Sequence, residues 1–283
     1  MNSLEKQDAG QPRHRSELQL RVLSGLALAA LALAAVWAGG WFFGLFVALL
    51  AAVASWEWCR IVRGIEFDWL LVLHSTAVVL AALAASAGYG VPAAVGLTVV
   101  AIVFWVLRLR NRDAMSGTGV LAIGLPVVCL ALMRVETVLG LQSILFIFFV
   151  VWATDIGGYM FGRSIGGPRL WTCISPSKTW AGAAGGLLLA ALVGPIASAL
   201  LSSGDAVALT VTAIMLGLAA EMGDLAESAL KRRFGRKDAS GLIPGHGGIL
   251  DRVDGLMAAA VVATLYAMFR NPMHPAAGLL LWP

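Results

Sequence analysis

The chain consists mainly of long apolar runs separated by short polar segments. A helix that crosses a bilayer needs roughly 20 mostly apolar residues, and nine stretches of the 283-residue chain approach that length. The stretch at 118–133 is the weakest, because it is short and Pro126 interrupts it. The pattern predicts an all-α, polytopic integral membrane protein with about nine transmembrane helices. The predicted spans are 18–38, 41–58, 68–87, 91–108, 118–133, 138–161, 180–202, 205–225 and 252–270.

Composition indicates the same class of protein. Hydrophobic residues make up 59% of the chain and charged residues only 13%, whereas a soluble domain carries roughly a quarter charged residues. One protein core cannot bury so much apolar surface, so we expect the lipid bilayer to cover most of it. The formal net charge of +4 then reflects basic cytoplasmic loops. We expect no nucleic-acid partner.

The distribution of basic residues predicts an orientation. If the N-terminus is cytoplasmic and nine spans alternate, 18 of the 20 Lys and Arg residues fall in cytoplasmic segments, and only Arg134 and Arg270 fall outside. Cytoplasmic loops of membrane proteins carry such an excess of positive charge. We therefore expect the N-terminus inside and the C-terminus outside.

The chain divides into three predicted regions. Residues 1–17 are polar and mixed in charge, which is typical of a disordered cytoplasmic lead. Residues 18–133 hold about five transmembrane helices, and residues 134–283 form a C-terminal transmembrane region that holds most of the candidate chemistry. The three cysteines lie far apart without a CxxC pair, so neither a disulfide framework nor a zinc site is indicated.

Several acidic residues lie within or at the edge of predicted spans. An ionised side chain at the bilayer centre costs about 2.5–3.5 kcal/mol on insertion scales, so such residues usually face a polar site. All of them lie toward the cytoplasmic end of their span, and we expect them to line one polar cavity that opens to the cytoplasm. These acids are Glu57, Asp155, Glu221, Asp224, Glu227, Asp251 and Asp254.

The sequence EMGDLAESALKR holds the densest group of acids. At helical spacing Glu221, Asp224 and Ser228 share one face. Carboxylates grouped in this way offer oxygen ligands to a hard cation such as Mg²⁺. Glu227 precedes Lys231 by four residues, which indicates an ordinary ion pair within the helix.

Two candidate site segments flank the loop between the sixth and seventh spans. Asp155 lies near the end of the sixth span, either in a site or in a helix-end ion pair with Arg163. Ser175 or Ser177 can cap the seventh helix, whose free N–H groups and dipole would favour an anion beside Lys178. The alternative for Lys178 is an interfacial anchor of a capped helix.

The long polar segment FGRKDASGLIPGHGGILDRVDG follows the eighth span. Glycines flank His246, so the backbone there can approach a ligand closely. The segment then leads into Asp251, Arg252 and Asp254 at the start of the ninth span. A glycine-rich loop with a histidine, acids and basic residues at the mouth of a membrane cavity indicates a functional site.

Residues 228–254, SALKRRFGRKDASGLIPGHGGILDRVD, carry a recognisable pattern. They resemble the signature of the phosphatidate cytidylyltransferase family: Ser-x-apolar-Lys-Arg, then Lys-Asp-x-small, then apolar-Pro-x-His-Gly-Gly-apolar-x-Asp-Arg-apolar-Asp. Every constrained position agrees. The segments around Asp155 and Lys178 are also similar to the family, and the resemblance is close over residues 150–270. Glu221 stands where the family would have a neutral residue.

The resemblance implies an enzyme that makes CDP-diacylglycerol and pyrophosphate from CTP and phosphatidic acid in the bacterial inner membrane. It implies a metal-dependent nucleotidyl transfer with Mg²⁺ as cofactor. A second cation, such as K⁺, and a homodimer are left open. The implied catalytic residues are Asp224, Asp251, Lys178 and His246. The implied metal ligands are Asp224, Asp251 and Asp254. The implied substrate contacts are Ser177, Lys231, Arg232, Lys237, Arg252, Asp155 and Ser228.

Three other functions fit parts of the pattern. A CTP-dependent lipid kinase would also use a metal and basic residues in a membrane cavity, but the signature disfavours it. A CDP-alcohol phosphotransferase would carry an Asp-Gly-x-x-Ala-Arg motif, which the sequence lacks. An ion-coupled transporter with carboxylates at Asp155 and Asp224 is disfavoured because the acids cluster at one membrane face.

Overall fold

The computed structural model describes residues 12–64, 66–107, 111–136, 138–201, 205–243 and 247–282. Each of the nine predicted spans coincides with a helix. The elements in chain order are α1 (Pro12–Ala38), α2 (Gly40–Arg63), α3 (Trp69–Ser86), α4 (Gly90–Leu107), α5 (Asn111–Arg134), α6 (Val138–Ser164), β1 (Arg169–Trp171), β2 (Ser175–Thr179), α7 (Trp180–Leu201), α8 (Ala206–Arg233), α9 (Leu250–Arg270) and α10 (Pro275–Leu280).

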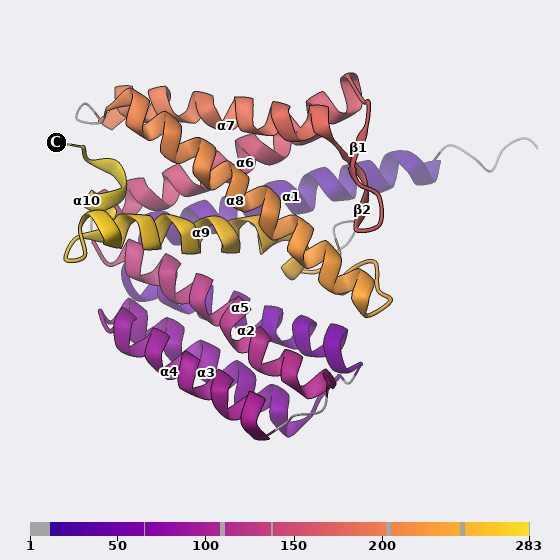
Figure 1. Ribbon diagram of the computed structural model, residues 1–283, viewed down its shortest axis with the longest axis vertical. Helices are drawn as coiled ribbons and strands as arrows, with labels where there is room; N and C mark the ends of the chain where they lie inside the picture. Colours follow the sequence, from indigo (N-terminus) through magenta and orange to yellow (C-terminus); the bar gives the residue numbers. More distant parts are fainter. Residues whose placement is uncertain are drawn as a thin grey trace, which may run out of the picture.

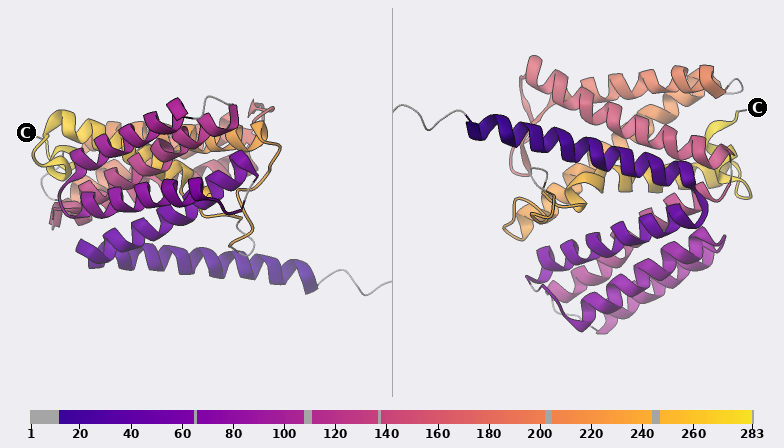
Figure 2. Two further views of the ribbon diagram at one scale, coloured as in Figure 1. Left: turned by 90° about the horizontal axis from the view of Figure 1, so that it is seen from below. Right: turned by 180° about the vertical axis from the view of Figure 1, so that it is seen from behind.

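The long helices form two groups that α9 joins. Helices α2 to α5 pack together on one side, and α6 to α8 pack together on the other (Figure 1). Helix α9 contacts α8 in one group and α5 in the other. Helix α1 runs along the outside of the bundle, as the left view of Figure 2 shows. Any site on α9 is therefore held by both groups.

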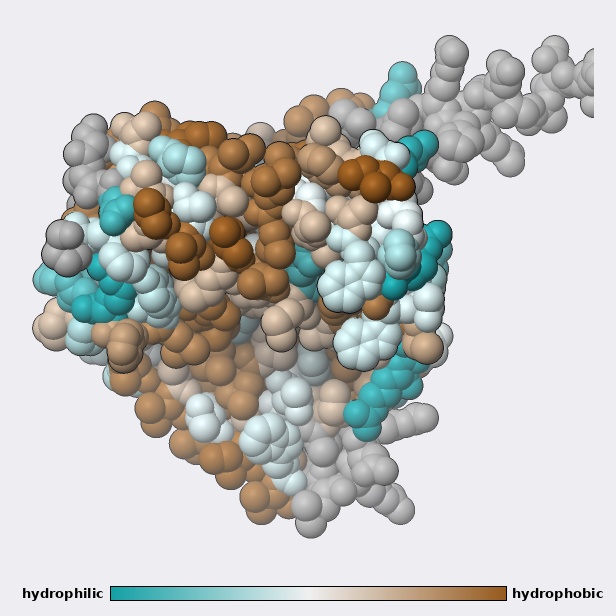
Figure 3. Space-filling model, turned by 45° about the horizontal axis from the view of Figure 1, so that its top comes forward, coloured by the Kyte–Doolittle hydropathy of each residue, from teal (hydrophilic) through white to brown (hydrophobic). Residues whose placement is uncertain are grey.

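The helices have the length and surface of membrane spans. Seven helices within the described residues are long and apolar enough to cross a membrane, and the apolar stretches Leu23–Ala38 and Gly90–Val106 are shorter. Large apolar side chains are exposed on the outside, such as Phe42 at 74% and Phe269 at 88%, and apolar residues cover much of the face in Figure 3. Lipid is the solvent that suits such a surface, and the protein is a polytopic membrane protein.

Several ends of helices differ from the prediction, by the most at α1, α5 and α8. Helix α5 begins at Asn111 instead of residue 118. Helix α1 begins at Pro12, so residues 12–17 of the predicted disordered lead are helical, and residues 1–11 lie outside the described residues. Helix α8 continues to Arg233, past the predicted end of its span. Its basic last turn complements the negative end of the helix dipole, so the helix continues where the apolar run stops.

The prediction of an all-α fold omitted one element. Strands β1 and β2 form an antiparallel hairpin between α6 and α7. The Trp180 N–H donates to the Pro168 carbonyl at 3.1 Å and closes the hairpin against the start of α7. Gly166 and Gly167 precede it with positive φ angles of 67° and 90°, which interrupt the helix and turn the chain back.

The two arginines outside the predicted cytoplasmic segments bind the ends of helices. The Arg134 Nε donates to the Val36 carbonyl at 2.8 Å, near the end of α1. Arg270 donates to the carbonyl oxygen of Gly278 at 2.6 Å and lies 3.6 Å from the centroid of the Trp282 ring. Carbonyl groups at helix C-termini lack partners in their own helix and carry partial negative charge. Both arginines that lie outside the basic cytoplasmic segments therefore have a structural role.

Glu57 connects α2 to the start of α9. Its carboxylate is completely buried and accepts hydrogen bonds from Ser240 Oγ at 2.5 Å, the Ile249 N–H at 3.0 Å and the Leu250 N–H at 2.7 Å. Ile249 is the N-cap of α9 and makes no side-chain capping bond. A carboxylate from α2 therefore caps α9, where N–H groups need acceptors and the dipole favours negative charge. The prediction that Glu57 lines the polar cavity is wrong.

We expect Glu57→Gln to lower the thermal stability of the protein in detergent. The amide keeps one acceptor oxygen but places an NH₂ donor against an N–H or O–H donor, a loss of about 1–3 kcal/mol for a buried group. Glu66→Gln is the matched control, because Glu66 is exposed in the loop between α2 and α3. Equal unfolding temperatures for the two variants would contradict the capping role.

Candidate active site

A polar cavity of about 680 Å³ lies between α6, the hairpin, α7, α8 and α9. It lies at the end of the bundle where Figure 1 shows the hairpin. All of the residues that line it come from the C-terminal part of the chain. They are Thr154, Asp155, Gly158, Tyr159, Gly162, Arg163, Arg169, Ser177, Lys178, Thr179, Gly182, Ala183, Glu221, Asp224 and Arg252.

Glycines allow α6 and α7 to form one wall of this cavity. A Cβ atom added at Gly157 would lie 2.5 Å from the Gly185 carbonyl oxygen, and one added at Gly182 would lie 2.8 Å from that of Gly158. No side chain fits at these distances, so the two backbones are in direct contact. This close approach places Asp155 on α6 near the hairpin that precedes α7.

Lys178 and Asp224 face each other across the cavity. The Lys178 ammonium lies 2.7 Å from Asp224 Oδ2, and the two side chains are 24% and 39% exposed. Ser228, one helical turn after Asp224, donates to Asp224 Oδ1 at 3.3 Å. The predicted shared face of Asp224 and Ser228 is therefore present, and the strand before α7 supplies the cation.

The residue that caps α7 differs from the prediction. The Gly182 N–H donates to Thr179 Oγ1 at 3.1 Å, so Thr179 is the capping side chain. Ser175 and Ser177, which were predicted as candidate caps, belong to strand β2. The strand continues to Thr179, and only a residue directly before the first helical turn can reach the N–H groups of that turn.

Lys231 lies between two carboxylates beside the cavity. Its Nζ contacts Glu227 Oε2 at 2.5 Å and Asp251 Oδ1 at 2.6 Å, which confirms the predicted pair with Glu227. Asp251 also accepts the N–H groups of Ala239 at 3.0 Å and Gly248 at 2.8 Å. Asp251 therefore holds Ala239 and Gly248 of this segment close to the start of α9.

Of the predicted site residues that the structure describes, five line the cavity and the others lie elsewhere. The five are Asp155, Ser177, Lys178, Asp224 and Arg252. Arg232 donates to the Ile174 carbonyl at the hairpin tip at 3.4 Å, and Lys237 is exposed on the loop after α8. Asp254 lines a different, apolar cavity. His246 lies outside the described residues.

Two of the residues that line the cavity make contacts that the sequence does not predict. Arg169 donates to the Ser177 carbonyl at 3.2 Å within the hairpin. The sequence indicates Arg169 only as a cytoplasmic charge, because no local pattern predicts the strand that carries it. Arg163 donates to the Tyr159 hydroxyl at 3.3 Å, instead of forming the ion pair with Asp155 that was considered.

Basic and acidic side chains line the same cavity. The cations are Arg163, Arg169, Lys178 and Arg252. The acids are Asp155, Glu221 and Asp224. Within the described residues no group of three or more His, Cys, Asp or Glu side chains is arranged to hold a metal ion by itself. Magnesium is usually held by one or two carboxylates together with substrate phosphates and water, so this donor set fits a metal–polyphosphate complex with basic residues around it.

The chain is similar to known proteins over most of its length. The phosphatidate cytidylyltransferase of Brucella suis biovar 1 (strain 1330) is 35% identical over 271 residues, which are 93% of this chain and 98% of that protein. The phosphatidate cytidylyltransferase of Staphylococcus haemolyticus (strain JCSC1435) is 47% identical over 121 residues, which are 42% of this chain and 46% of that protein.

The family profile matches as widely. The profile described as "Cytidylyltransferase family" covers residues 19–269. That range includes every residue of the polar cavity and all helices from α2 to α8. The family match includes every residue of the polar cavity, and the Brucella relative matches the chain over nearly its full length. The chain therefore belongs to the cytidylyltransferase family.

Proposed function

We propose that the protein is a phosphatidate cytidylyltransferase, which converts CTP and phosphatidic acid to CDP-diacylglycerol and pyrophosphate. The family and the named activity of its full-length relative support this function. The observation that carries it is the polar cavity, in which Lys178 and Arg252 stand with Asp224 at one end of an apolar bundle. Such a cavity suits one water-soluble polyanion and one lipid.

The chemistry requires two polyanions to meet. A phosphate oxygen of phosphatidic acid attacks the α-phosphorus of CTP, the bond to the β-phosphate oxygen breaks, and pyrophosphate leaves. Catalysis of this kind rests on positioning and on charge neutralisation. We assign Lys178, Arg169 and Arg252 to phosphate oxygens, because all three line the cavity. A phosphate nucleophile needs no strong base, so we assign none.

We further propose Mg²⁺ as the cofactor, with Asp224 and Asp155 as the cavity carboxylates that hold it. When bound, it would neutralise charge on the triphosphate. Asp251 and Asp254 remain proposed ligands on the strength of the signature. Asp251 would first have to exchange its bonds to Lys231 and the loop. A second cation such as K⁺ remains part of the proposal.

We also propose that all nine apolar helices cross the bacterial inner membrane, with the N-terminus in the cytoplasm and the C-terminus outside. The hairpin, the loop after α8 and the first turn of α1 lie at the same end of the bundle, and the C-terminus lies at the other (Figure 1). The basic last turns of α2 and α8 and the basic residues of the hairpin lie at the first end, as expected for cytoplasmic loops. Residues 134–283 would then form the catalytic region.

Removal of the charge of Asp224 tests the proposed metal site. We expect Asp224→Asn and Asp251→Asn each to lower kcat by about 10²–10³-fold or more, the scale found when a key electrostatic group is removed from an active site. Turnover of labelled CTP into an organic-soluble product, measured with and without Mg²⁺, gives the result. Asp205→Asn at the other end of α8 is the control, because asparagine caps a helix as well as aspartate does. Normal turnover in either mutant would remove that residue from the site.

Lys178 separates a structural from a functional role. If it contacts a phosphate, Lys178→Ala should reduce kcat/KM by about tenfold or more, as expected for a lost charged contact of about 1.5–3 kcal/mol. Lys178→Arg should also impair turnover, because a planar fork replaces a compact charge poorly. Thermal stability in detergent should change little in both variants. A fully active Lys178→Ala enzyme would refute the assignment.

Cysteine labelling tests the proposed topology. In a background in which alanine replaces the three native cysteines, we expect Lys237→Cys to react with a membrane-impermeant maleimide only from the cytoplasmic side. Tyr89→Cys, in the exposed connection between α3 and α4, should react only from outside. Both side chains are exposed, so each site is accessible to the reagent. Labelling of both from one side would show that the span count is wrong.

A further inference from the structure

An apolar groove of about 280 Å³ lies between α1, α2, α6 and α9. Residues such as Leu28, Phe46, Phe148 and Leu256 line it. Asp155 and Arg252 are the charged residues in its lining, and both also line the polar cavity. The apolar groove and the polar cavity therefore share one wall. A molecule with a charged head and a hydrocarbon tail can have its head in the cavity and its tail in the groove.

Small residues make up part of the α1 side of the groove, beside Leu28 and Leu31. Gly25, Ala29 and Ala32 follow at helical spacing, and all three line the groove. Small residues at this spacing usually bring two membrane helices into close contact. Here they leave a space between α1 and its neighbours instead. Helix α1 lies along the outside of the bundle (Figure 2), so this space adjoins the surface that lipid covers.

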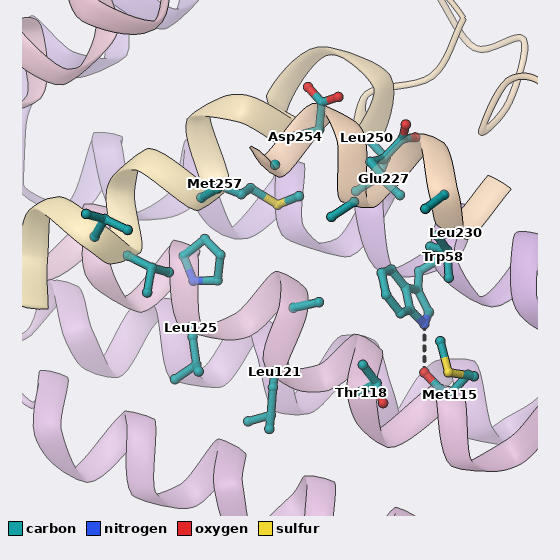
Figure 4. Close-up of a pocket in the computed structure, with 18 of the residues that line it drawn as sticks. Trp58, Met115, Thr118, Leu121, Leu125, Glu227, Leu230, Leu250, Asp254 and Met257 are labelled. Atoms are coloured by element: carbon teal, nitrogen blue, oxygen red, sulfur yellow. Dashed lines mark hydrogen bonds between the residues drawn. The ribbon is translucent and has the colours of Figure 1, made fainter. Parts of the chain in front are cut away.

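A second apolar cavity, of about 670 Å³, lies between α5, α8 and α9 and is less suited to the same task. It shares no lining residue with the polar cavity. Asp254 and Glu227 are among its lining residues, but Figure 4 shows both carboxylates directed away from the apolar side chains. The Trp58 indole, also in its wall, donates to the Met115 carbonyl at 2.9 Å. A lipid tail in this cavity would have no path along shared residues to Lys178 and Asp224.

We infer that the groove beside α1 binds an acyl chain of the phosphatidic acid substrate, while its phosphate lies at the junction near Arg252. This inference rests on the proposed function and names the lipid subsite of the same cavity. The guanidinium of Arg252 complements a lipid phosphate, and the apolar side chains of the groove pack against a chain that leaves other hydrocarbon, so the fit of the chain is a matter of packing. The chain enters from the bilayer beside α1, and CTP enters from the end of the bundle with the hairpin.

The test fills the groove with Ala29→Leu and compares it with Ala30→Leu. The two positions are adjacent on α1, but Ala29 lines the groove and Ala30 is exposed outside it. The probes are long-chain and short-chain phosphatidic acid in detergent micelles at saturating CTP. We expect Ala29→Leu to raise KM for the long-chain substrate about fivefold or more, because a larger side chain in an already filled apolar space costs about 1 kcal/mol or more. The KM for CTP, the kcat and the short-chain KM should change little. Ala30→Leu should match the unmodified enzyme.

Other results would overturn the inference. If Ala29→Leu and Ala30→Leu give the same KM for long-chain substrate, or if Ala29→Leu raises KM equally for both chain lengths, the substrate chain does not lie in the groove. An ordinary membrane phospholipid in the groove predicts the first of these results. Ala32→Leu repeats the test one turn along α1 and decides the question if Ala29→Leu does not purify. Absence of cytidylyl transfer in the unmodified protein would refute the proposed function itself.

Discussion

The start of α9 depends on two carboxylates that accept backbone N–H groups away from bulk water. Glu57 on α2 accepts from Ile249 and Leu250, and Asp251 accepts from Gly248 and Ala239. A buried N–H group without an acceptor is costly, so Ala239 and residues 248–250 are held close to these acids. That constraint fixes the first turn of α9, from which Arg252 reaches the polar cavity.

The same contacts explain why the two helix groups act as one unit. The cavity is built from α6 to α9 and the hairpin, yet the carboxylate that caps α9 comes from α2 in the other group. Lys231 adds a link within the C-terminal half, because it joins α8 to α9 through Asp251. The position of the site therefore depends on the N-terminal helices, although none of their residues lines the polar cavity.

The apolar pattern was sufficient to predict the helices, because in lipid only long apolar segments with internal hydrogen bonds can cross. The Glu227–Lys231 pair was also predictable, since both residues lie on one helix at fixed spacing. The roles of Glu57 and Thr179 were not predictable. Glu57 accepts its bonds from residues more than 180 positions away, and Thr179 caps α7 only because a short strand precedes it. Local patterns carry no signal for either contact.

The Lys178–Asp224 pair connects this architecture with the proposed reaction. Each residue satisfies the charge of the other across the cavity at 2.7 Å, and both side chains remain partly exposed. A fully buried pair would resist exchange, because removal of one partner leaves an uncompensated charge. In a partly exposed pair, a phosphate can take the place of Asp224 beside the lysine, and a cation can take the place of Lys178 beside the aspartate, at much smaller cost. Since the two charges come from β2 and α8, a metal–triphosphate complex that replaces the pair would also hold these two elements together.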